Sequence, residues 1–279
     1  MTRQDSGNDR VQALPEEILL QVAPPELSAR GVLYPLAWEE LMGRKVGRGE
    51  LGPVLHLWQH PGALVIGHRD RRLPAAAAAL EKLRQSGLDA CVRPSGGAAV
   101  LLDSGVLNVS LIMPNPQHSI GIHADFQLMA QLLGDAISPW HPLVRAGEVS
   151  GSFCPGDYDL SIDGRKFCGI AQRRQAKAYM ITAFVIVTGT GVDRGRTVRS
   201  FYDTAAEESG HDYPQVVPET MGSLAELARV PSVEAYIESL LTTVQKTSTL
   251  QILKDAEAEL SDLDGQVAAL RARYDTDIK

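Results

Sequence analysis

Short apolar runs separated by turn residues dominate the first two thirds of the chain. Apolar runs bounded by Gly, Pro, Asp or Ser predict β-strands. The runs of this kind lie at Val54–Trp58, Ala63–Ile66, Asp89–Arg93, Ala98–Leu102, Val106–Ile112 and Tyr179–Val187. His60-Pro61-Gly62, between the first two runs, is typical of a hairpin turn. Asp163-Gly164 predicts another hairpin, between Leu160–Ile162 and Lys166–Ile170, because both positions of its two-residue turn need a positive φ.

Helical periodicity appears between and after these runs. Leu73-Pro74 opens an alanine-rich segment that runs through Arg84 and ends at Gly87, and Pro suits a first helical turn as Gly suits a helix end. His123–Ser138 carries apolar residues at helical spacing. The helices expected after Gly195 lie at Val233–Val244 and Leu250–Tyr274.

These elements predict an α/β protein in which a mixed β-sheet is flanked by helices and followed by a helical C-terminal extension. A chain of 279 residues suits one large domain with at most a small appendage. Residues 1–30 are polar and interrupted by Pro, so we expect them to form a partly ordered N-terminal arm. Residues 231–279 are expected to be a helical extension packed on the same domain.

The charge balance limits the classes of partner. The net charge of −7 argues against a general nucleic-acid binder, which needs a broad basic surface. No apolar run is long enough to cross a bilayer and Met1–Arg10 has no apolar signal core, so we expect a soluble, cytoplasmic protein with no membrane partner. Basic residues nevertheless cluster twice, either as solvated surface or as a docking face for an acidic partner. The clusters are Arg69, Arg71 and Arg72, and then Arg165, Lys166, Arg173, Arg174 and Lys177.

The three cysteines differ in their surroundings. Cys91 and Cys168 lie in apolar strands, where a free cysteine is usually a small buried residue. Cys154 lies in a loop with Gly151, Pro155 and Gly156, where an apolar core position is not expected. The odd count and the absence of zinc-ligand spacing argue against both a disulfide framework and a metal site.

Lys166 follows Cys154 by one predicted hairpin. A nearby ammonium group favours the thiolate, which is the nucleophilic form of cysteine. The pair is therefore a candidate nucleophile and electrostatic partner for covalent acyl transfer, whereas each residue alone is more often structural.

A glycine-rich turn, Ser95-Gly96-Gly97, separates two predicted strands. Adjacent glycines let a ligand approach the backbone closely, although a plain glycine-rich hairpin explains them equally well. In the next strand, Asn108 and Ser110 would share one face, opposite Val109 and Leu111.

Two blocks of the sequence resemble the lipoate protein ligase and octanoyltransferase family. The first is Arg-Pro-Ser-Gly-Gly-Ala-Ala-Val from Arg93, followed by Leu-Asn-Val-Ser to Ser110; the second is Gly-Arg-Lys-Phe-Cys-Gly-Ile-Ala-Gln from Gly164. The resemblance runs from about Leu51 to Met221. It implies the catalytic-domain fold of biotin and lipoate protein ligases over residues 31–230.

Three further segments are similar to one branch, the octanoyl-[GcvH]:protein N-octanoyltransferases of Gram-positive bacteria. They are Arg72-Leu73-Pro74, Gly151–Ser161 and Pro218–Met221. This branch moves an octanoyl group from a lysine of the glycine cleavage H protein to lipoyl domains of 2-oxoacid dehydrogenase E2 subunits, without a cofactor. The expected partners of this chain are therefore those two kinds of protein.

The resemblance also implies roles for individual residues. Cys154 would be the acyl-thioester nucleophile and Lys166 its partner lysine, acting either as an ammonium group or as a general base. The residues expected to bind substrate are Arg93, Ser95, Gly96, Gly97, Asn108, Ser110, Gly169 and Ala171. An apolar slot for the acyl chain is expected along Val100, Val109 and Leu111.

Three other functions stay open at this point. An octanoyltransferase that draws on octanoyl-acyl carrier protein would use the same cysteine and lysine. An ATP-dependent lipoate-protein ligase would consume ATP and would not need Cys154. A non-catalytic binder of lipoyl domains would tolerate the loss of both residues.

Overall fold

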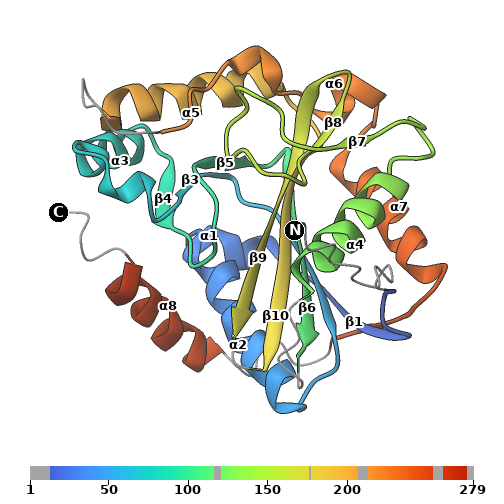
Figure 1. The fold of residues 1–279 in the computed structure, drawn as a ribbon. Coiled ribbons are helices and arrows are strands. Elements are labelled where there is room, and N and C mark those ends of the chain that lie inside the picture. The colour runs from blue at the N-terminus through green and yellow to red at the C-terminus, as the bar shows by residue number, and fades with distance from the viewer. Residues whose placement is uncertain (1–12, 116–120, 176, 207–212, 254–259, 275–279) are drawn as a thin grey trace, which may run out of the picture.

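The computed structural model describes residues 13–115, 121–175, 177–206, 213–253 and 260–274. Its central element is an eight-stranded mixed sheet (Figure 1). In spatial order the strands are β11 (Thr249–Ile252), β1 (Glu17–Val22), β2 (Val54–Trp58), β6 (Val106–Pro114), β10 (Ala178–Ile186), β9 (Arg165–Gln175), β8 (Leu160–Ile162) and β7 (Arg145–Ala146). β1 is parallel to both of its neighbours, and the remaining pairs are antiparallel.

A second, three-stranded sheet stands beside the first. Its central strand is β3 (Gly62–Ile66), which pairs in parallel with β4 (Asp89–Val92) and antiparallel with β5 (Val100–Asp103). The glycine-rich turn therefore joins two strands that do not pair with each other, and it crosses the end of β3. A plain hairpin at this turn is excluded.

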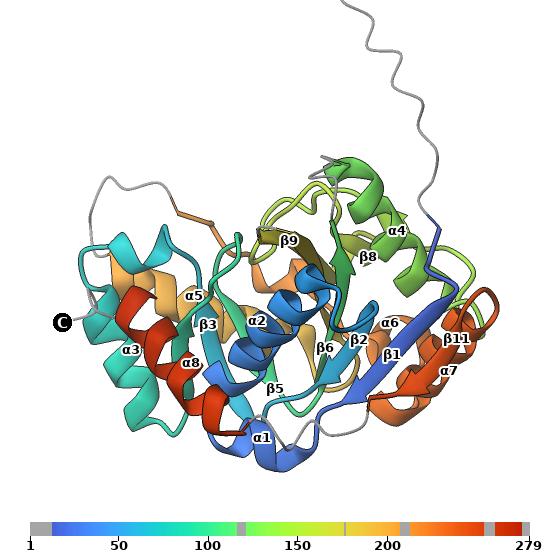
Figure 2. The same ribbon diagram turned by 90° about the horizontal axis from the view of Figure 1, so that it is seen from below.

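Helices cover both faces of the large sheet. α4 and α7 lie on one side of β6, β9 and β10, and α2 lies on the other with α8 packed outside it (Figures 1 and 2). α3 and α5 pack together against the small sheet. The helices are α1 (Pro25–Ala29), α2 (Leu33–Arg48), α3 (Ala76–Gln85), α4 (Ile122–Asp135), α5 (Gly191–Ala206), α6 (Leu224–Ala228), α7 (Val233–Gln245) and α8 (Leu260–Tyr274), with short 3-10 turns η1 (Asp70–Arg72) and η2 (Pro218–Thr220).

The large sheet separates two hydrophobic cores. Alternation along β6 assigns its residues to the two sides, because successive side chains of a strand point to opposite faces. Val109 and Leu111 pack in the core under α4 and α7, while Val106 and Ile112 belong to the core shared with α2 and the small sheet. Asn108 and Ser110 therefore face the α2 side, and they share one face opposite Val109 and Leu111, as the sequence predicted.

The sequence predicts most strands and the β8–β9 hairpin correctly. Asp163 and Gly164 both have the positive φ that the turn requires, 50° and 75°. The α/β class with a mixed sheet flanked by helices is confirmed.

Three expectations about connections are wrong. β2 and β3 do not form a hairpin, since His60-Pro61-Gly62 carries the chain from the large sheet to the small one. Residues 17–22, expected in a partly ordered arm, form β1 inside the large sheet. The segment Leu250–Tyr274 was expected to be one helix. Its first residues belong instead to strand β11, which pairs with β1, and its last part is helix α8; residues 254–259 lie outside the described part.

Within the described ranges, no helix has the length and apolar character that crossing a membrane requires.

Two helical glycines should respond oppositely to alanine. A Cβ on Gly195 would lie 2.7 Å from Pro218 Cα, whereas a Cβ on Gly265 would meet no atom within 4 Å. We expect Gly195→Ala to lower the free energy of unfolding by about 1–3 kcal/mol through overpacking. Gly265→Ala should raise it by up to about 1 kcal/mol through helix propensity. Urea unfolding measures both, and equal effects of the two substitutions would contradict the packing of α5 on η2.

Candidate active site

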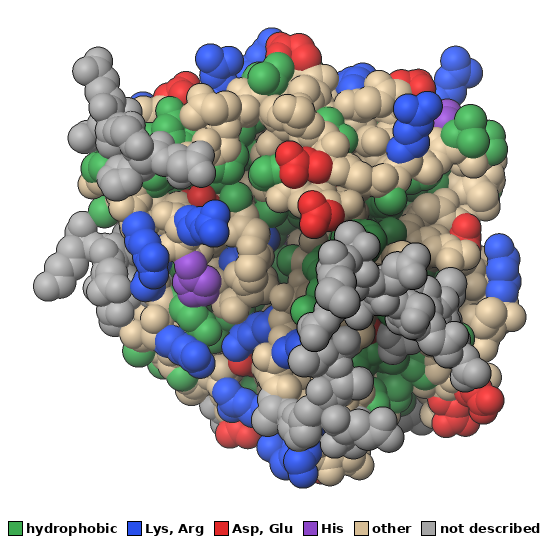
Figure 3. All heavy atoms as spheres, in the orientation of Figure 1, with side chains coloured by type: hydrophobic (Ala, Val, Ile, Leu, Met, Phe, Trp, Pro, Cys, Tyr) green, Lys and Arg blue, Asp and Glu red, His purple; other side chains and the backbone are tan. Residues whose placement is uncertain are grey.

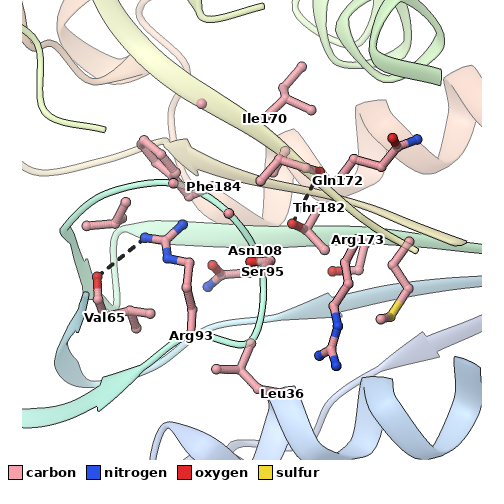
Figure 4. A pocket seen from close by; sticks show the side chains of 18 of the residues that line it. Leu36, Val65, Arg93, Ser95, Asn108, Ile170, Gln172, Arg173, Thr182 and Phe184 are labelled. Atoms are coloured by element: carbon pink, nitrogen blue, oxygen red, sulfur yellow. Dashed lines mark hydrogen bonds between the residues drawn. The ribbon is translucent and has the colours of Figure 1, made fainter. Parts of the chain in front are cut away.

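A cavity of about 300 Å³ lies on the α2 side of the large sheet, where the glycine-rich loop faces β9 and β10 (Figure 4). Its size is at the lower end for small-molecule pockets. Its apolar lining includes Trp58, Val65, Val100, Leu102, Met180 and Phe184. Its polar lining includes Arg93, Ser95, Asn108, Gln172, Arg173 and Thr182.

Cys154 borders this cavity from the loop between β7 and β8. Its backbone has a φ of 48°, which residues with a Cβ seldom adopt. Its side chain is 9% exposed, and the backbone N–H of Ala98 donates to its sulfur at 3.3 Å. A Cβ on Gly97 would lie 3.1 Å from the same sulfur. The glycine-rich loop thus brings a backbone donor to the thiol, and a side chain at Gly97 would crowd that contact.

Lys166 is fully buried behind the cysteine loop. Its ammonium group donates to the carbonyl oxygens of Phe153 at 2.9 Å and of Cys154 at 2.6 Å, and it lies 2.8 Å from Asp159 Oδ2. Three oxygen acceptors match the three N–H donors that only the ammonium form provides. Lys166 therefore fixes the backbone that carries the thiol.

Asp159 is the counter-charge of Lys166, and sequence reasoning missed it. The side chain is 1% exposed, and it also accepts from the Gly156 N–H at 3.1 Å. Burial raises its pKa to about 6, although the Lys166 ammonium acts in the opposite direction. One signal in the sequence could have found Asp159. A buried lysine needs a carboxylate to balance its charge, and the loop before β8 supplies this one.

A second buried network holds the glycine-rich loop. Tyr202 of α5 donates its hydroxyl to Asp70 Oδ1 at 3.0 Å and accepts from the Ala99 N–H at 3.0 Å. Asp70 Oδ2 accepts from the Gly67 N–H at 2.8 Å. Burial raises the pKa of Asp70 and that of Tyr202, so the hydroxyl keeps its proton. Neither residue was predicted, because they lie far apart in the sequence and in different elements.

Arg93 braces the same loop from inside the cavity. Its guanidinium donates to the Ala98 carbonyl at 2.6 Å and to the Val65 carbonyl at 3.3 Å (Figure 4). Gly67 and Gly97 approach so closely that a Cβ on Gly67 would collide with the Gly97 carbonyl oxygen. The loop is thus fixed by its own arginine, by a close glycine contact and by the Asp70–Tyr202 pair.

A carboxylate that the sequence did not single out lies in the cavity wall. Glu39 Oε1 accepts from the Ser110 hydroxyl at 2.6 Å and from the Trp58 indole N–H at 3.0 Å, and it lies 3.0 Å from His56 Nδ1. The Ser110 hydroxyl is therefore a hydrogen-bond donor to Glu39. Three side chains thus converge on one oxygen of Glu39 in the cavity wall, while Nε2 of His56 is buried without a hydrogen-bond partner among the described residues.

The structure places all eight of the predicted substrate-binding residues around one cavity. Those that line it are Arg93, Ser95, Gly96, Gly97, Asn108, Ser110, Gly169 and Ala171. A Cβ on Gly169 would lie 2.5 Å from the Phe184 ring and 3.3 Å from Lys166 Nζ, so this position has no room for a side chain. The expected acyl slot is only partly correct. Val100 lines the cavity, but Val109 and Leu111 face the opposite core because β6 alternates.

The second basic cluster is largely neutralised within the chain. Four of its members pair with carboxylates, in the pairs Arg165–Glu226, Lys166–Asp159, Arg173–Glu40 and Arg174–Asp125. The positive charge of these four residues is therefore balanced within the chain.

The other two cysteines are buried in strands β4 and β9, as predicted. Burial raises the pKa of the Cys168 thiol well above its usual range, which disfavours its thiolate. In the part of the chain that is described, no three His, Cys, Asp or Glu side chains come together in a way that could hold a metal ion.

The cysteine loop, Lys166 and the glycine-rich loop all lie in a region that matches a known protein family. The model of the lipoyl protein ligase A/B catalytic domain matches residues 32–245, which include the cysteine loop, Lys166 and the glycine-rich loop. The chain belongs to this family. The match confirms the family that the two sequence blocks indicated.

Several relatives in the family cover most of the chain. An "octanoyl-[GcvH]:protein N-octanoyltransferase" of Anoxybacillus flavithermus is 40% identical over 212 residues, which are 75% of this chain and 76% of the relative. A "lipoyl-[GcvH]:protein N-lipoyltransferase" of Listeria monocytogenes is 35% identical over 195 residues, covering 69% and 70% of the two chains.

Solved structures of the family share the fold. A lipoate-protein ligase A bound with ATP superposes with a TM-score of 0.69 at 19% identity, covering 91% of this chain and 95% of that one. The bipartite lipoate protein ligase of Thermoplasma acidophilum gives 0.64 at 17% identity, covering 92% and 93%. At these identities the likeness shows the family fold alone.

Loss of the Tyr202 hydroxyl should disturb the site specifically. Tyr202→Phe removes the hydroxyl that accepts from the Ala99 N–H and donates to Asp70 Oδ1, at a cost of about 1–3 kcal/mol. We expect the glycine-rich loop to shift, so that Cys154 loses its N–H donor and is alkylated by iodoacetamide about threefold more slowly or worse. Peptide mass mapping follows Cys154 separately from Cys91 and Cys168.

A second buried tyrosine provides the matched control. Tyr236 donates to the Leu133 carbonyl at 3.2 Å in the core under α4, on the far side of the sheet from the cavity. Tyr236→Phe should lower stability while Cys154 alkylation stays at the wild-type rate. Equal alkylation rates in both variants would show that Tyr202 does not position the loop.

Proposed function

We propose that this protein is an octanoyl or lipoyl amidotransferase of protein lipoylation, which works through a thioester on Cys154. The observation that carries the proposal is the position of the Cys154 sulfur, at the edge of a partly apolar cavity and in contact with the Ala98 N–H. The names of the family relatives support the choice of acyl group and of an H-protein donor.

The proposed reaction exchanges one lysine amide for another. The Cys154 thiolate attacks the amide carbonyl of the donor lysine, and collapse of the adduct expels the lysine amine, which takes up a proton. The amine of the acceptor lysine then attacks the thioester and returns the thiol. Atoms balance without ATP, because one amide is broken and one amide is formed. The thioester divides a difficult amide exchange into two steps, each with one bound protein.

The surrounding residues would each serve one of these steps. The Ala98 N–H is placed to donate to the oxyanion that develops beside Cys154, once the sulfur has bonded to carbon. Lys166 would act as an ammonium group that fixes the loop and adds positive charge behind the thiolate, since its three protons already have acceptors. This favours the electrostatic role over that of a general base.

The acyl chain would occupy the cavity. Its apolar walls from β2, β5 and β10 suit a medium-length aliphatic chain, and its volume of about 300 Å³ limits the length. We propose that the eight lining residues predicted from the sequence, from Arg93 to Ala171, bind this group. The acceptors would be lipoyl domains of 2-oxoacid dehydrogenase E2 subunits, and the donor the glycine cleavage H protein.

The state of the cysteines agrees with a cytoplasmic location. Cys91, Cys154 and Cys168 are all free thiols. A cysteine that forms thioesters must stay reduced, which the cytoplasm provides.

A transfer assay without ATP tests the proposal. The wild-type protein, octanoylated H protein and an apo-lipoyl domain should give octanoylated acceptor by mass spectrometry. Cys154→Ser should lower the rate on the order of 1,000-fold, because serine is a far weaker nucleophile in this setting. The matched control is Cys168→Ser, which alters a buried thiol of the adjoining strand. Transfer that required ATP, or full activity of Cys154→Ser, would exclude the amidotransferase.

The pH dependence of acylation should report Asp159. Its pKa is raised to about 6, so its ionised form, which pairs with Lys166, is lost as the pH falls through that value. We expect the single-turnover rate of Cys154 acylation to fall below about pH 6. The free energy of unfolding should change with pH in the opposite direction to the acylation rate. The folded protein holds the Asp159 proton more tightly than the unfolded chain does, so Asp159 lowers stability as the pH rises from about 4 to about 6.

Asp159→Asn is the control for this profile, since the amide cannot ionise. Its acylation rate should be lower than that of wild type but flat between about pH 5 and 7. A variant that kept the wild-type acid limb would assign that limb to another group.

A further inference from the structure

A group of basic side chains lies beside the cavity on the face shown in Figure 3. We call His68, Arg69, Arg71, Arg72 and Arg273 the basic patch. Arg69, Arg72 and Arg273 are exposed, and the other two are half-buried. Figure 3 shows Lys and Arg side chains gathered around a histidine next to a hollow, on the side where α3 and α8 lie in Figure 1. The patch joins two parts of the chain that are about 200 residues apart.

Contacts with the end of α8 hold the patch together. Arg71 donates to the Tyr274 carbonyl at 2.8 Å, and the His68 ring lies 5.0 Å from the Tyr274 ring. The Arg273 guanidinium lies 5.2 Å from that ring. Burial lowers the pKa of His68, and the positive charges of Arg71, Arg72 and Arg273 lower it further, which shows how closely these charges are grouped.

The basic patch adjoins the loop that presents a donor to Cys154. His68, the first residue of the patch, directly follows Gly67, which lies close to the Gly97 carbonyl. Asp70, between Arg69 and Arg71 in the sequence, belongs to the network that holds Ala99. On the other side, Arg173 lines the cavity, and its pKa is lowered by burial and by the charge of Arg273. The patch therefore adjoins two parts of the cavity wall, the glycine-rich loop and Arg173.

The patch stands out against the rest of the molecule. The chain carries a net charge of −7, and the second basic cluster is paired with carboxylates. Over the described ranges, no carboxylate forms an ion pair with Arg69, Arg72 or Arg273. Within those ranges no carboxylate balances their charge, so it adds to the field that steers an acidic partner.

We propose that the basic patch docks an acidic face of the protein domains that carry the acyl-lysine and the acceptor lysine. This inference rests on the proposed function and adds the surface and the charge of its partners. An acidic face next to the lysine would be steered to the patch before the side chain enters the cavity. Charges at the rim of an interface act mainly on the association rate, and salt screens them. The net negative charge of the chain disfavours nucleic acid as the occupant.

The test reverses two exposed charges of the patch. Arg69→Glu/Arg72→Glu should lower kcat/KM for octanoylated H protein about tenfold or more at low salt, with most of the loss in KM. The deficit should shrink as the salt concentration rises, because screening weakens the attraction that the variant has lost. Acylation of Cys154 by an octanoyl thioester of a small thiol should keep its wild-type rate, because this donor presents no acidic face.

The matched control is Arg196→Glu/Arg199→Glu on α5, which makes the same change in net charge with two exposed arginines outside the patch. It should retain nearly wild-type kcat/KM for the protein donor. Equal losses in the two double variants, or an equal loss with the small thioester, would overturn the docking role. A labelled duplex oligonucleotide that bound the wild type and not the patch variant at physiological salt would overturn it in favour of nucleic acid.

These outcomes are separate from failure of the proposed function. If the wild type transfers no octanoyl group from H protein, the amidotransferase proposal fails. If the wild type transfers it and the patch variant does so equally well at low salt, only the docking surface is wrong.

Discussion

One buried lysine holds the shape of the cysteine loop, and the rest of the candidate site depends on it. Cys154 adopts a left-handed backbone, which costs on the order of 1 kcal/mol for a residue with a Cβ. Lys166 offsets this cost by donating to the carbonyl oxygens of Phe153 and Cys154. Asp159 balances its charge, and an unpaired charge at this depth would cost about 3–5 kcal/mol. Loop, hairpin and ion pair therefore form one unit.

The proposed reaction also requires a second unit, because a positioned thiol without a donor for its oxyanion has little catalytic value. That unit is the glycine-rich loop, which Arg93 and Tyr202 hold from two sides. The first unit belongs to the large sheet and the second to the small sheet. The cavity lies where the two sheets meet. Substitutions that shift one sheet against the other should therefore affect the reaction even when they touch neither Cys154 nor Lys166.

Local sequence patterns predicted the structural features that neighbouring residues determine, such as turns and the faces of strands. Asp163-Gly164 marked a hairpin because its turn tolerates few alternatives, and the alternation of β6 assigned Asn108 and Ser110 to one face. Pairings between distant segments were not predictable in this way. No local pattern separates β2 from β3 into different sheets, or brings Asp70 to Tyr202. Motif reasoning therefore found the residues that would react and missed those that position them.

The central claim is that Cys154 carries the acyl group between two proteins, and isolation of the acylated protein tests it most directly. The wild-type protein is incubated with octanoylated H protein without ATP, separated from the donor and analysed by peptide mass mapping. We predict an octanoyl group on the Cys154 peptide, labile to neutral hydroxylamine as a thioester is, which passes to an apo-lipoyl domain added afterwards. An unmodified Cys154 peptide in a preparation that still transfers the octanoyl group would contradict the account.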